Sequence, residues 1–246
     1  MTEAVMTRCF WQPPTSKRVP KVELKVAVNS ADLRSLGADL KSGISRRIYF
    51  LDTADLALQQ HGLIVRLRST KGRAADAVVK LRPVLPKALP AWLRNDDGFD
   101  VEIDALPDNY ACSGALKRTL GRHDVERAVA GRKPLAGLLS GRQRRLLTAY
   151  ANVPLRSLLT FGPVEVRRCR FDLAASDYPL VAEEWTFPDG SSIAELSTRC
   201  LSARAAEVAA ETSSALRAHG IVPDGEPQVS KTEATLRYFR PLFANP

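Results

Sequence analysis

The sequence has few of the residues that support disulfide, zinc or histidine chemistry. Its four cysteines form no C-x-x-C pair, and its three histidines stand at scattered positions. We therefore expect free thiols and no zinc site. Long apolar runs are also missing. None approaches the roughly 18–20 residues of a membrane span, and no apolar secretory segment follows the first charges. These absences predict a cytoplasmic globular protein.

Positive charge is in excess, with 36 Lys and Arg against 27 Asp and Glu and a net charge of +9. Such a balance suits an anionic partner, either a nucleic acid, a phosphate ligand or an acidic surface. The arginine-rich segment 117–145 lacks the interleaved aromatic residues typical of single-stranded nucleic-acid binding, and its helical spacing indicates a solvated face. Nucleic-acid binding is therefore the least favoured of these alternatives.

The alternation of charged and apolar residues, together with turn-forming residues, predicts one domain over 21–246. A flexible arm at 1–20 is expected to precede it. Helical spacing, glycine punctuation and many arginines predict a helical insertion at about 107–160. Helices are also expected over 31–41, 54–62 and 203–219, and from Ser230 onward. The predicted strands cover 21–28, 46–53, 63–70, 76–83, 98–106, 163–171, 178–187 and 192–200.

Charged side chains gather on one face of these strands, because alternate residues of a strand point to opposite faces. Lysine and arginine recur at i and i+2 on three strands, and acidic residues do so on a fourth. The basic pairs are Arg66 and Arg68, Lys80 and Arg82, and Arg168 and Arg170, and the acidic set is Asp100, Glu102 and Asp104. Other predicted strands also carry charges on one face: Glu23 and Lys25 on one strand, Glu184 on a second and Glu195 on a third.

Two architectures fit this alternation. The ordinary one is an antiparallel sheet with a buried face and a solvated face. The other is a closed barrel coated by helices, with the charges lining its lumen. The repeated basic pairs and the bulky apolar residues opposite them favour the barrel, and eight strands can enclose one small ligand. We therefore predict an α+β fold, an eight-stranded antiparallel β-barrel with flanking helices and a helical insertion.

A lumen lined by cations requires an anionic ligand, because burying an unpaired charge is energetically costly. A polyphosphate chain suits it, since guanidinium groups bind phosphate oxygens through paired hydrogen bonds. Mg²⁺ commonly lies between one or two carboxylates and substrate phosphates. The pattern therefore predicts metal binding by Glu23, Glu102, Glu184 and Glu195 opposite the basic residues.

Two sequence motifs point to a known family. Segment 49–68, YFLDTADLALQQHGLIVRLR, has an aromatic pair, an aspartate–threonine step and an R-x-R ending, and KVELK at 21–25 ends in Glu-x-Lys. These motifs resemble the CYTH superfamily, the triphosphate tunnel metalloenzymes that include thiamine triphosphatases, class IV adenylyl cyclases and inorganic triphosphatases. The similarity spans roughly residues 20–240. Lys21 replaces the first Glu of the family's ExExK strand, and Ser197 replaces a carboxylate expected after Glu195.

The resemblance implies a metal-dependent triphosphatase whose Mg²⁺ or Mn²⁺ site is weakened by these two replacements. Lys25 would orient or deprotonate the attacking water, and Glu23, Glu184 and Glu195 would hold the metal. Phosphate groups would contact Lys25, Arg66, Arg68, Lys80, Arg82, Arg168 and Arg170.

A metal-dependent hydrolase of an inorganic or organic triphosphate is thus the first functional hypothesis. The alternative is a non-catalytic binder or sensor of phosphorylated ligands, which Lys21 and Ser197 favour because they remove carboxylates. The expected partner in both cases is a triphosphate or nucleotide-like small molecule. The sequence leaves the substrate and the oligomeric state open.

Overall fold

The structure, a computed structural model, describes residues 21–85, 88–106, 110–173, 176–222 and 229–243. The predicted arm at 1–20 lies outside these residues. The strands are β1 (Lys21–Val28), β2 (Ile44–Asp52), β3 (Leu63–Thr70), β4 (Ala75–Leu81), β5 (Phe99–Ala105), β6 (Tyr110–Leu120), β7 (Leu159–Phe171), β8 (Leu180–Thr186) and β9 (Ser192–Leu201). The helices are α2 (Ser30–Ser35), α3 (Ala57–Gln60), α4 (Ala91–Arg94), α5 (Asp124–Val129), α6 (Gly141–Tyr150), α7 (Ala205–Ala218) and α8 (Lys231–Phe239).

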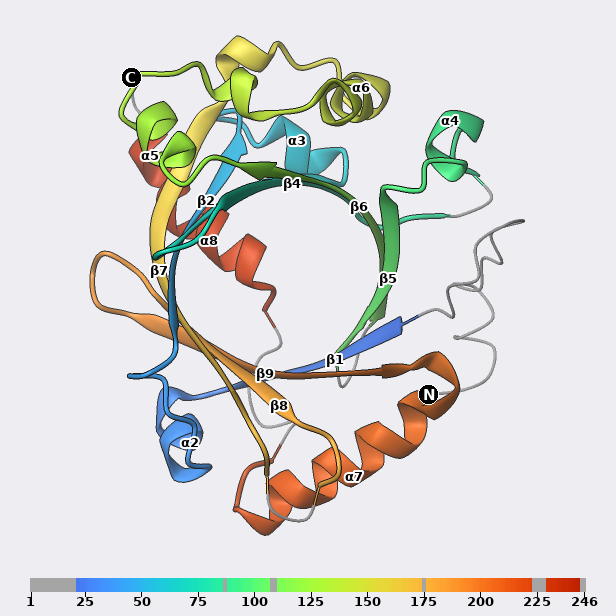
Figure 1. Cartoon of the computed structure of the whole chain (residues 1–246), viewed down its shortest axis with the longest axis vertical. Coiled ribbons are helices and arrows are strands. Elements are labelled where there is room, and N and C mark those ends of the chain that lie inside the picture. The colour runs from blue at the N-terminus through green and yellow to red at the C-terminus, as the bar shows by residue number, and fades with distance from the viewer. Residues whose placement is uncertain (1–20, 86–87, 107–109, 174–175, 223–228, 244–246) are drawn as a thin grey trace.

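The strands close into one barrel in the order β1-β5-β6-β4-β3-β2-β7-β8-β9 (Figure 1). The prediction of a helix-flanked α+β barrel is confirmed, but the described chain contributes nine strands where eight were expected. Every neighbouring pair is antiparallel except β1 and β5, which run parallel. An odd number of strands cannot alternate direction around a closed ring, so one parallel pair is unavoidable. The barrel is therefore mixed.

The additional strand is β6, and the prediction that a helical insertion begins at 107 is wrong at this point. Residues 110–120 alternate as a strand does: Cys112, Leu116 and Leu120 are buried on the outer face. Their inward neighbours at 111, 113 and 115 are Ala, Ser and Ala, so no stripe of charge marked the strand. Helical structure occupies only the later part of the predicted insertion, in α5, α6 and two short 3-10 turns before β7.

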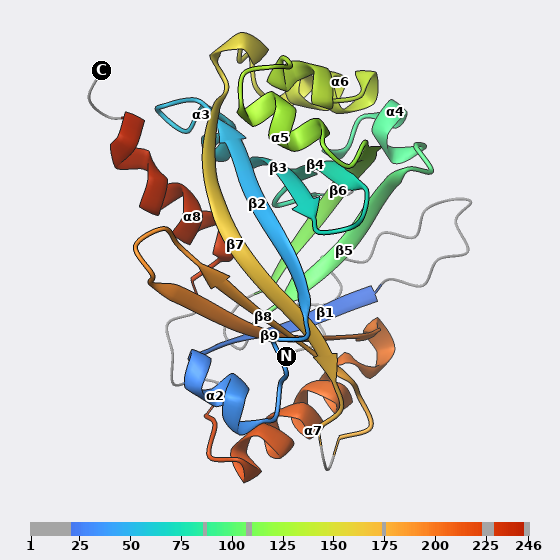
Figure 2. The same ribbon diagram turned by 60° about the vertical axis from the view of Figure 1, so that its left-hand side comes forward.

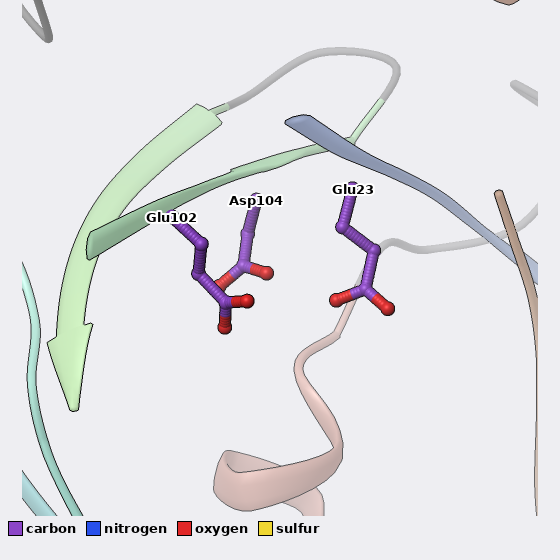
Figure 3. A group of neighbouring side chains, drawn as sticks. All are labelled: Glu23, Glu102 and Asp104. Carbon is purple, nitrogen blue, oxygen red and sulfur yellow. The ribbon is translucent and has the colours of Figure 1, made fainter. Parts of the chain in front are cut away.

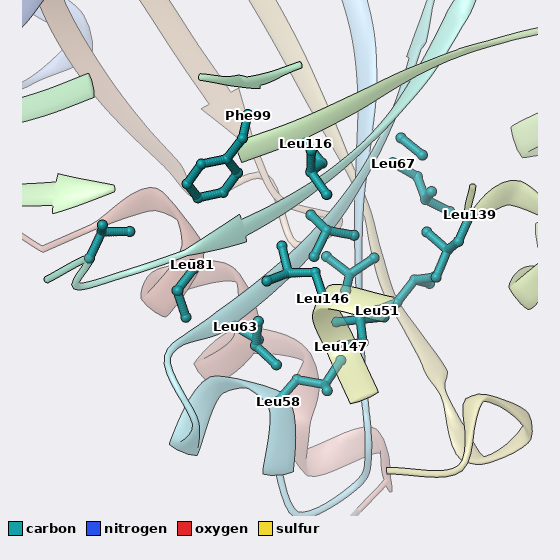
Figure 4. Close-up of a cluster of buried hydrophobic side chains, with 14 of the residues drawn as sticks. Leu51, Leu58, Leu63, Leu67, Leu81, Phe99, Leu116, Leu139, Leu146 and Leu147 are labelled. Carbon is teal, nitrogen blue, oxygen red and sulfur yellow. The ribbon is translucent and has the colours of Figure 1, made fainter. Parts of the chain in front are cut away.

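The largest apolar core lies outside the barrel, where α3, α5 and α6 cover β3, β4 and β6 (Figure 4). Leucines from the strands, such as Leu63 and Leu67, meet Leu146 and Leu147 of α6. Gln143 fixes α6 on the sheet, because its buried Nε2 donates to the carbonyl oxygens of Ala77 on β4 and Leu116 on β6, both at 2.9 Å. The bulky apolar strand positions thus face outward beneath helices.

A second outer layer consists of α2 and α7, which cover the part of the barrel formed by β1, β8 and β9 (Figure 2). Leu33 of α2 and Leu216 of α7 are buried in it together with Leu196 of β9. Gly220, with a φ of 76°, follows α7 and allows the chain to turn away. The helix predicted over 203–219 is therefore confirmed, and it ends before this glycine.

The barrel interior has an apolar end and a charged remainder. Helix α8 packs on β2 and β7, and its Leu236 and Phe239 join Phe50, Val166 and Trp185 in a third cluster. The helix predicted from Ser230 onward is confirmed, and Ser230 caps it by accepting a hydrogen bond from the Glu233 amide at 3.2 Å. Beyond this cluster, the interior holds charged side chains from most strands, and small residues on β6. Among the described residues, no helix is long and apolar enough to cross a membrane.

Candidate functional site

Asp104 of β5 anchors one wall of the charged interior. Its side chain is 1% exposed and accepts hydrogen bonds from Lys25 Nζ at 2.7 Å, Lys80 Nζ at 3.0 Å and Ser113 Oγ at 3.3 Å. Arg82 Nη1 lies 4.0 Å from the same carboxylate. Burial alone would raise the pKa of Asp104, but Lys25 and Lys80 outweigh burial and hold the pKa well below its ordinary value.

Glu23 and Glu102 extend this wall on either side of Asp104. Lys25 Nζ lies 3.0 Å from Glu23, and Lys80 Nζ lies 2.9 Å from Glu102. One oxygen from each of Glu23, Glu102 and Asp104 lies within 4.8 Å of the others, and Figure 3 shows the three carboxylates converging from β1 and β5. Three clustered carboxylates are a donor set that fits one Mg²⁺ or Mn²⁺ ion.

Lys25 has a clear protonation state. Burial alone would lower the pKa of Lys25, but Asp104 and Glu23 outweigh burial and raise it above its ordinary value. The ammonium is therefore charged at neutral pH. A charged Lys25 can orient water or stabilise negative charge, but it cannot act as a general base.

Arginines dominate the opposite wall, which β2, β3 and β7 form. Arg68 Nη2 lies 2.6 Å from Asp76, and Arg168 Nε lies 3.4 Å from Glu183. Arg46 Nη1 lies 3.6 Å from Glu183 as well. Cations thus outnumber carboxylates along this wall.

Two of these guanidinium groups have unsatisfied donors. The Nε atoms of Arg46 and Arg66 are buried and lack a hydrogen-bond partner within the described part of the chain. Burial and the nearby Arg68 lower the pKa of Arg46 to about 10, and the same two causes lower the pKa of Arg66. At that pKa, Arg46 remains charged at neutral pH. Buried cationic donors without partners are energetically costly, and an anion placed between them would satisfy them.

A third group of charges joins the barrel to α8. Lys231 Nζ lies 2.7 Å from both Glu183 of β8 and Glu195 of β9. Trp185 Nε1 donates a hydrogen bond to Glu183 at 3.2 Å. Burial alone would raise the pKa of Glu183, but Lys231 outweighs it and lowers the pKa to about 2. The carboxylate is therefore ionised at neutral pH.

The structure brings most of the predicted site residues into one interior. Ion pairs or burial place these residues there: Glu23, Lys25, Arg66, Arg68, Lys80, Arg82, Glu102, Arg168 and Glu195. Arg170 lies at the end of β7 and is exposed, opposite Val181, and it takes part in none of the ion pairs of the described residues. Lys21, which the resemblance to the ExExK motif aligned with that motif's first Glu, is exposed at the first position of β1.

Glu184 does not face the interior, and the structure corrects the inward residue of β8 to Glu183. Glu184 shares the outer face of the strand with Ala182, which packs in the cluster beneath α2 and α7. Glu183 shares the inner face with Trp185, which packs inside against α8. The sequence prediction assumed a charged inner face throughout, whereas the interior is apolar at this end.

Sequence reasoning also missed several interior charges. Arg46 precedes two inward apolar residues, Ile48 and Phe50, so no charge alternation marked its strand. Lys231 lies on a helix, where strand alternation gives no signal. Asp104 belongs to the predicted acidic face of its strand, but only Glu102 of that face was predicted as a ligand. Arg199, whose Nε lies 3.3 Å from Glu23, follows Ser197 on the inner face of β9 and could have been found by the same alternation.

No protein-family profile and no curated protein sequence matches the chain. Solved structures that share its fold include the following two. A Bacillus halodurans protein, named as a candidate adenylate cyclase, has 15% sequence identity and a TM-score of 0.59, with 90% of this chain and 97% of that chain covered. The Hippeastrum protein HpAC1, named as a candidate adenylyl cyclase that reveals a dominant triphosphatase activity, has 14% identity and a TM-score of 0.60, with 84% and 91% covered. At these identities the likeness establishes the fold alone. It agrees with the helix-flanked barrel that the sequence predicts.

Proposed function

We propose that this CYTH-type barrel binds the polyphosphate group of a small molecule in its interior and hydrolyses the terminal phosphoanhydride bond. The observation that supports this proposal most strongly is that the buried Nε donors of Arg46 and Arg66 lack a hydrogen-bond partner within the described chain. Phosphate oxygens are the ligands that such guanidinium groups bind best. The triphosphatase activity stated for HpAC1 favours hydrolysis over cyclisation.

The residues have distinct tasks in this proposal. Arg46, Arg66 and Arg168 hold the phosphate chain, and Arg68 remains fixed by Asp76. Lys25 stays protonated and stabilises charge that develops on the phosphoryl oxygens. A Mg²⁺ or Mn²⁺ ion held by Glu23, Glu102 and Asp104 would supply further charge neutralisation at the phosphates.

A non-catalytic phosphate binder is the second candidate, and one observation favours it. Lys25 and Lys80 already bind the carboxylates that would hold the metal, at 2.7–3.0 Å. A metal ion would have to compete with two ammonium groups of the chain itself. Binding could therefore persist where hydrolysis is lost.

Two parallel measurements separate these functions. Phosphate release is measured with inorganic triphosphate, ATP and thiamine triphosphate, each with Mg²⁺ or Mn²⁺, while calorimetry records binding of the same ligands. Metal-dependent release of phosphate supports the hydrolase. Binding without turnover supports the second candidate. Absence of both binding and turnover for all three ligands contradicts the proposal.

A further inference from the structure

Lys231 has the surroundings of a bound cation. Its Nζ lies 2.7 Å from Glu183 Oε2 and 2.7 Å from Glu195 Oε1, with its side chain 19% exposed. The same atom lies 5.2 Å from the centre of the Trp185 ring. The ammonium thus has two carboxylate oxygens and an aromatic face around it, a full set of partners for a cation.

The two carboxylates need such a cation. Glu183 and Glu195 are directly opposite each other across β8 and β9, where like charges destabilise a sheet. Arg46 and Arg168 approach Glu183 only through Oε1, at 3.6 and 3.4 Å. Glu183 Oε2, which also accepts a hydrogen bond from Trp185 Nε1 at 3.2 Å, and Glu195 Oε1 both face Lys231. Two carboxylate oxygens so placed could equally hold a divalent ion.

We propose that the Lys231 ammonium takes the place of a divalent metal between Glu183 and Glu195, so that this pair becomes a metal site only when the lysine is removed. The divalent cation of the interior is then confined to Glu23, Glu102 and Asp104. The inference concerns cation binding alone and does not depend on the proposed phosphate chemistry.

Lys231 could instead have a purely structural role, in which its ion pairs with Glu183 and Glu195 only hold α8 against the barrel. The two roles predict different behaviour of the carboxylates once the lysine charge is removed. If the role of Lys231 is only structural, its removal leaves two carboxylates that repel each other and bind no cation. If Lys231 takes the place of a metal ion, its removal leaves a carboxylate pair that binds Mn²⁺ from solution.

The test is calorimetric titration of Mn²⁺ without any phosphate ligand. We expect Lys231→Gln to bind one more equivalent of Mn²⁺ than the unmodified protein, to show a Mn²⁺-dependent change in Trp185 emission, and to gain more melting temperature from Mn²⁺. Adding Glu195→Gln to this variant should remove the extra equivalent. Lys133→Gln, which removes a lysine paired with Asp124 at 2.9 Å on the outer helices, should bind as the unmodified protein does.

A folded Lys231→Gln protein that binds no additional Mn²⁺ would overturn the inference, as would Mn²⁺ binding by Glu183 and Glu195 in the unmodified protein. If the variant does not fold alone, Mn²⁺ present during refolding should restore native Trp185 emission. Failure of that recovery also overturns the inference. Loss of triphosphate binding in separate experiments would contradict only the proposed function.

Discussion

The buried Nε atoms of Arg46 and Arg66 have no partner in the described chain, and this makes the two residues sensitive probes of the interior. Arg66→Ala should weaken inorganic triphosphate binding by about 1.5–3 kcal/mol, the contribution of a charge-assisted hydrogen bond. It should not lower the melting temperature, because burial and Arg68 already oppose the charge of Arg66. Calorimetry and thermal unfolding measure the two effects.

Arg127→Ala, an exposed change on α5, is the control for Arg66→Ala. It should leave triphosphate affinity within about twofold, since one exposed distant charge is screened by salt. Equal losses in both variants would mean that the phosphate group binds outside the barrel.

Asp104 makes stability depend on pH in a defined direction. Its pKa is depressed in the folded chain, because Lys25 and Lys80 outweigh the effect of burial. The stability from this group is therefore complete above the unfolded pKa of about 3.9 and is lost as the pH falls through the lower folded value. Urea unfolding between pH 7 and 2 should show a decline below about pH 4.

Asp104→Asn should cost about 3–5 kcal/mol at pH 7, because it leaves Lys25 and Lys80 without their shared carboxylate. The decline toward acid should also become shallower in this variant. An unchanged acid slope would show that other groups, such as Glu183, carry the pH dependence.

Among the structural elements, β5 and β6 meet through an aromatic ring packed on a glycine. A Cβ at Gly114 would collide with the ring of Phe99, which is 6% exposed. Gly114→Ala should therefore destabilise the protein by about 1–3 kcal/mol, the cost of overpacking. The free energy of unfolding in urea measures this loss.

Phe99→Ala tests the cause of that loss. In the double variant the added methyl no longer meets the ring, so Gly114→Ala should cost less in the Phe99→Ala background than in the unmodified protein. Additive losses would show that the backbone of β6, rather than the ring, requires glycine at 114.

The sequence predicted elements well where one strand face is charged and the other apolar, as on β3 and β4. It failed on β6, whose inward residues at 111, 113 and 115 are small, and on the inward residue of β8. Both failures have one physical cause: the interior is not uniformly charged. Contacts made by α8, including Lys231, depend on packing across the barrel and leave no periodic trace in the sequence.

On the scale of the whole molecule, a large excess of positive charge lies in one segment outside the charged interior. Residues 117–156 hold ten Lys and Arg but two Asp and Glu, an excess of eight positive charges in a chain whose total is +9. The exposed basic residues there are Lys117, Arg122, Arg127, Arg132, Arg142, Arg144, Arg145 and Arg156. This outer basic face, 117–156, therefore contributes to the long-range attraction of anions.

Neutralising part of this outer basic face should separate surface attraction from interior binding. The triple variant Arg127→Gln, Arg132→Gln and Arg144→Gln should elute from a polyanion resin at lower salt, because it has three fewer exposed positive charges. Its calorimetric affinity for inorganic triphosphate at 0.15 M salt should stay within about threefold, since charges beyond roughly 8 Å are screened there. A larger loss would place ligand binding on the outer face.

A crystal structure with a non-hydrolysable triphosphate analogue and Mn²⁺ tests interior phosphate binding most directly. We predict phosphate oxygens within about 3 Å of the Nε atoms of Arg46 and Arg66, a hydrogen-bonding distance, with Mn²⁺ at Glu23, Glu102 and Asp104. An analogue bound only to the outer basic face, with both Nε atoms still lacking a partner, would contradict interior binding.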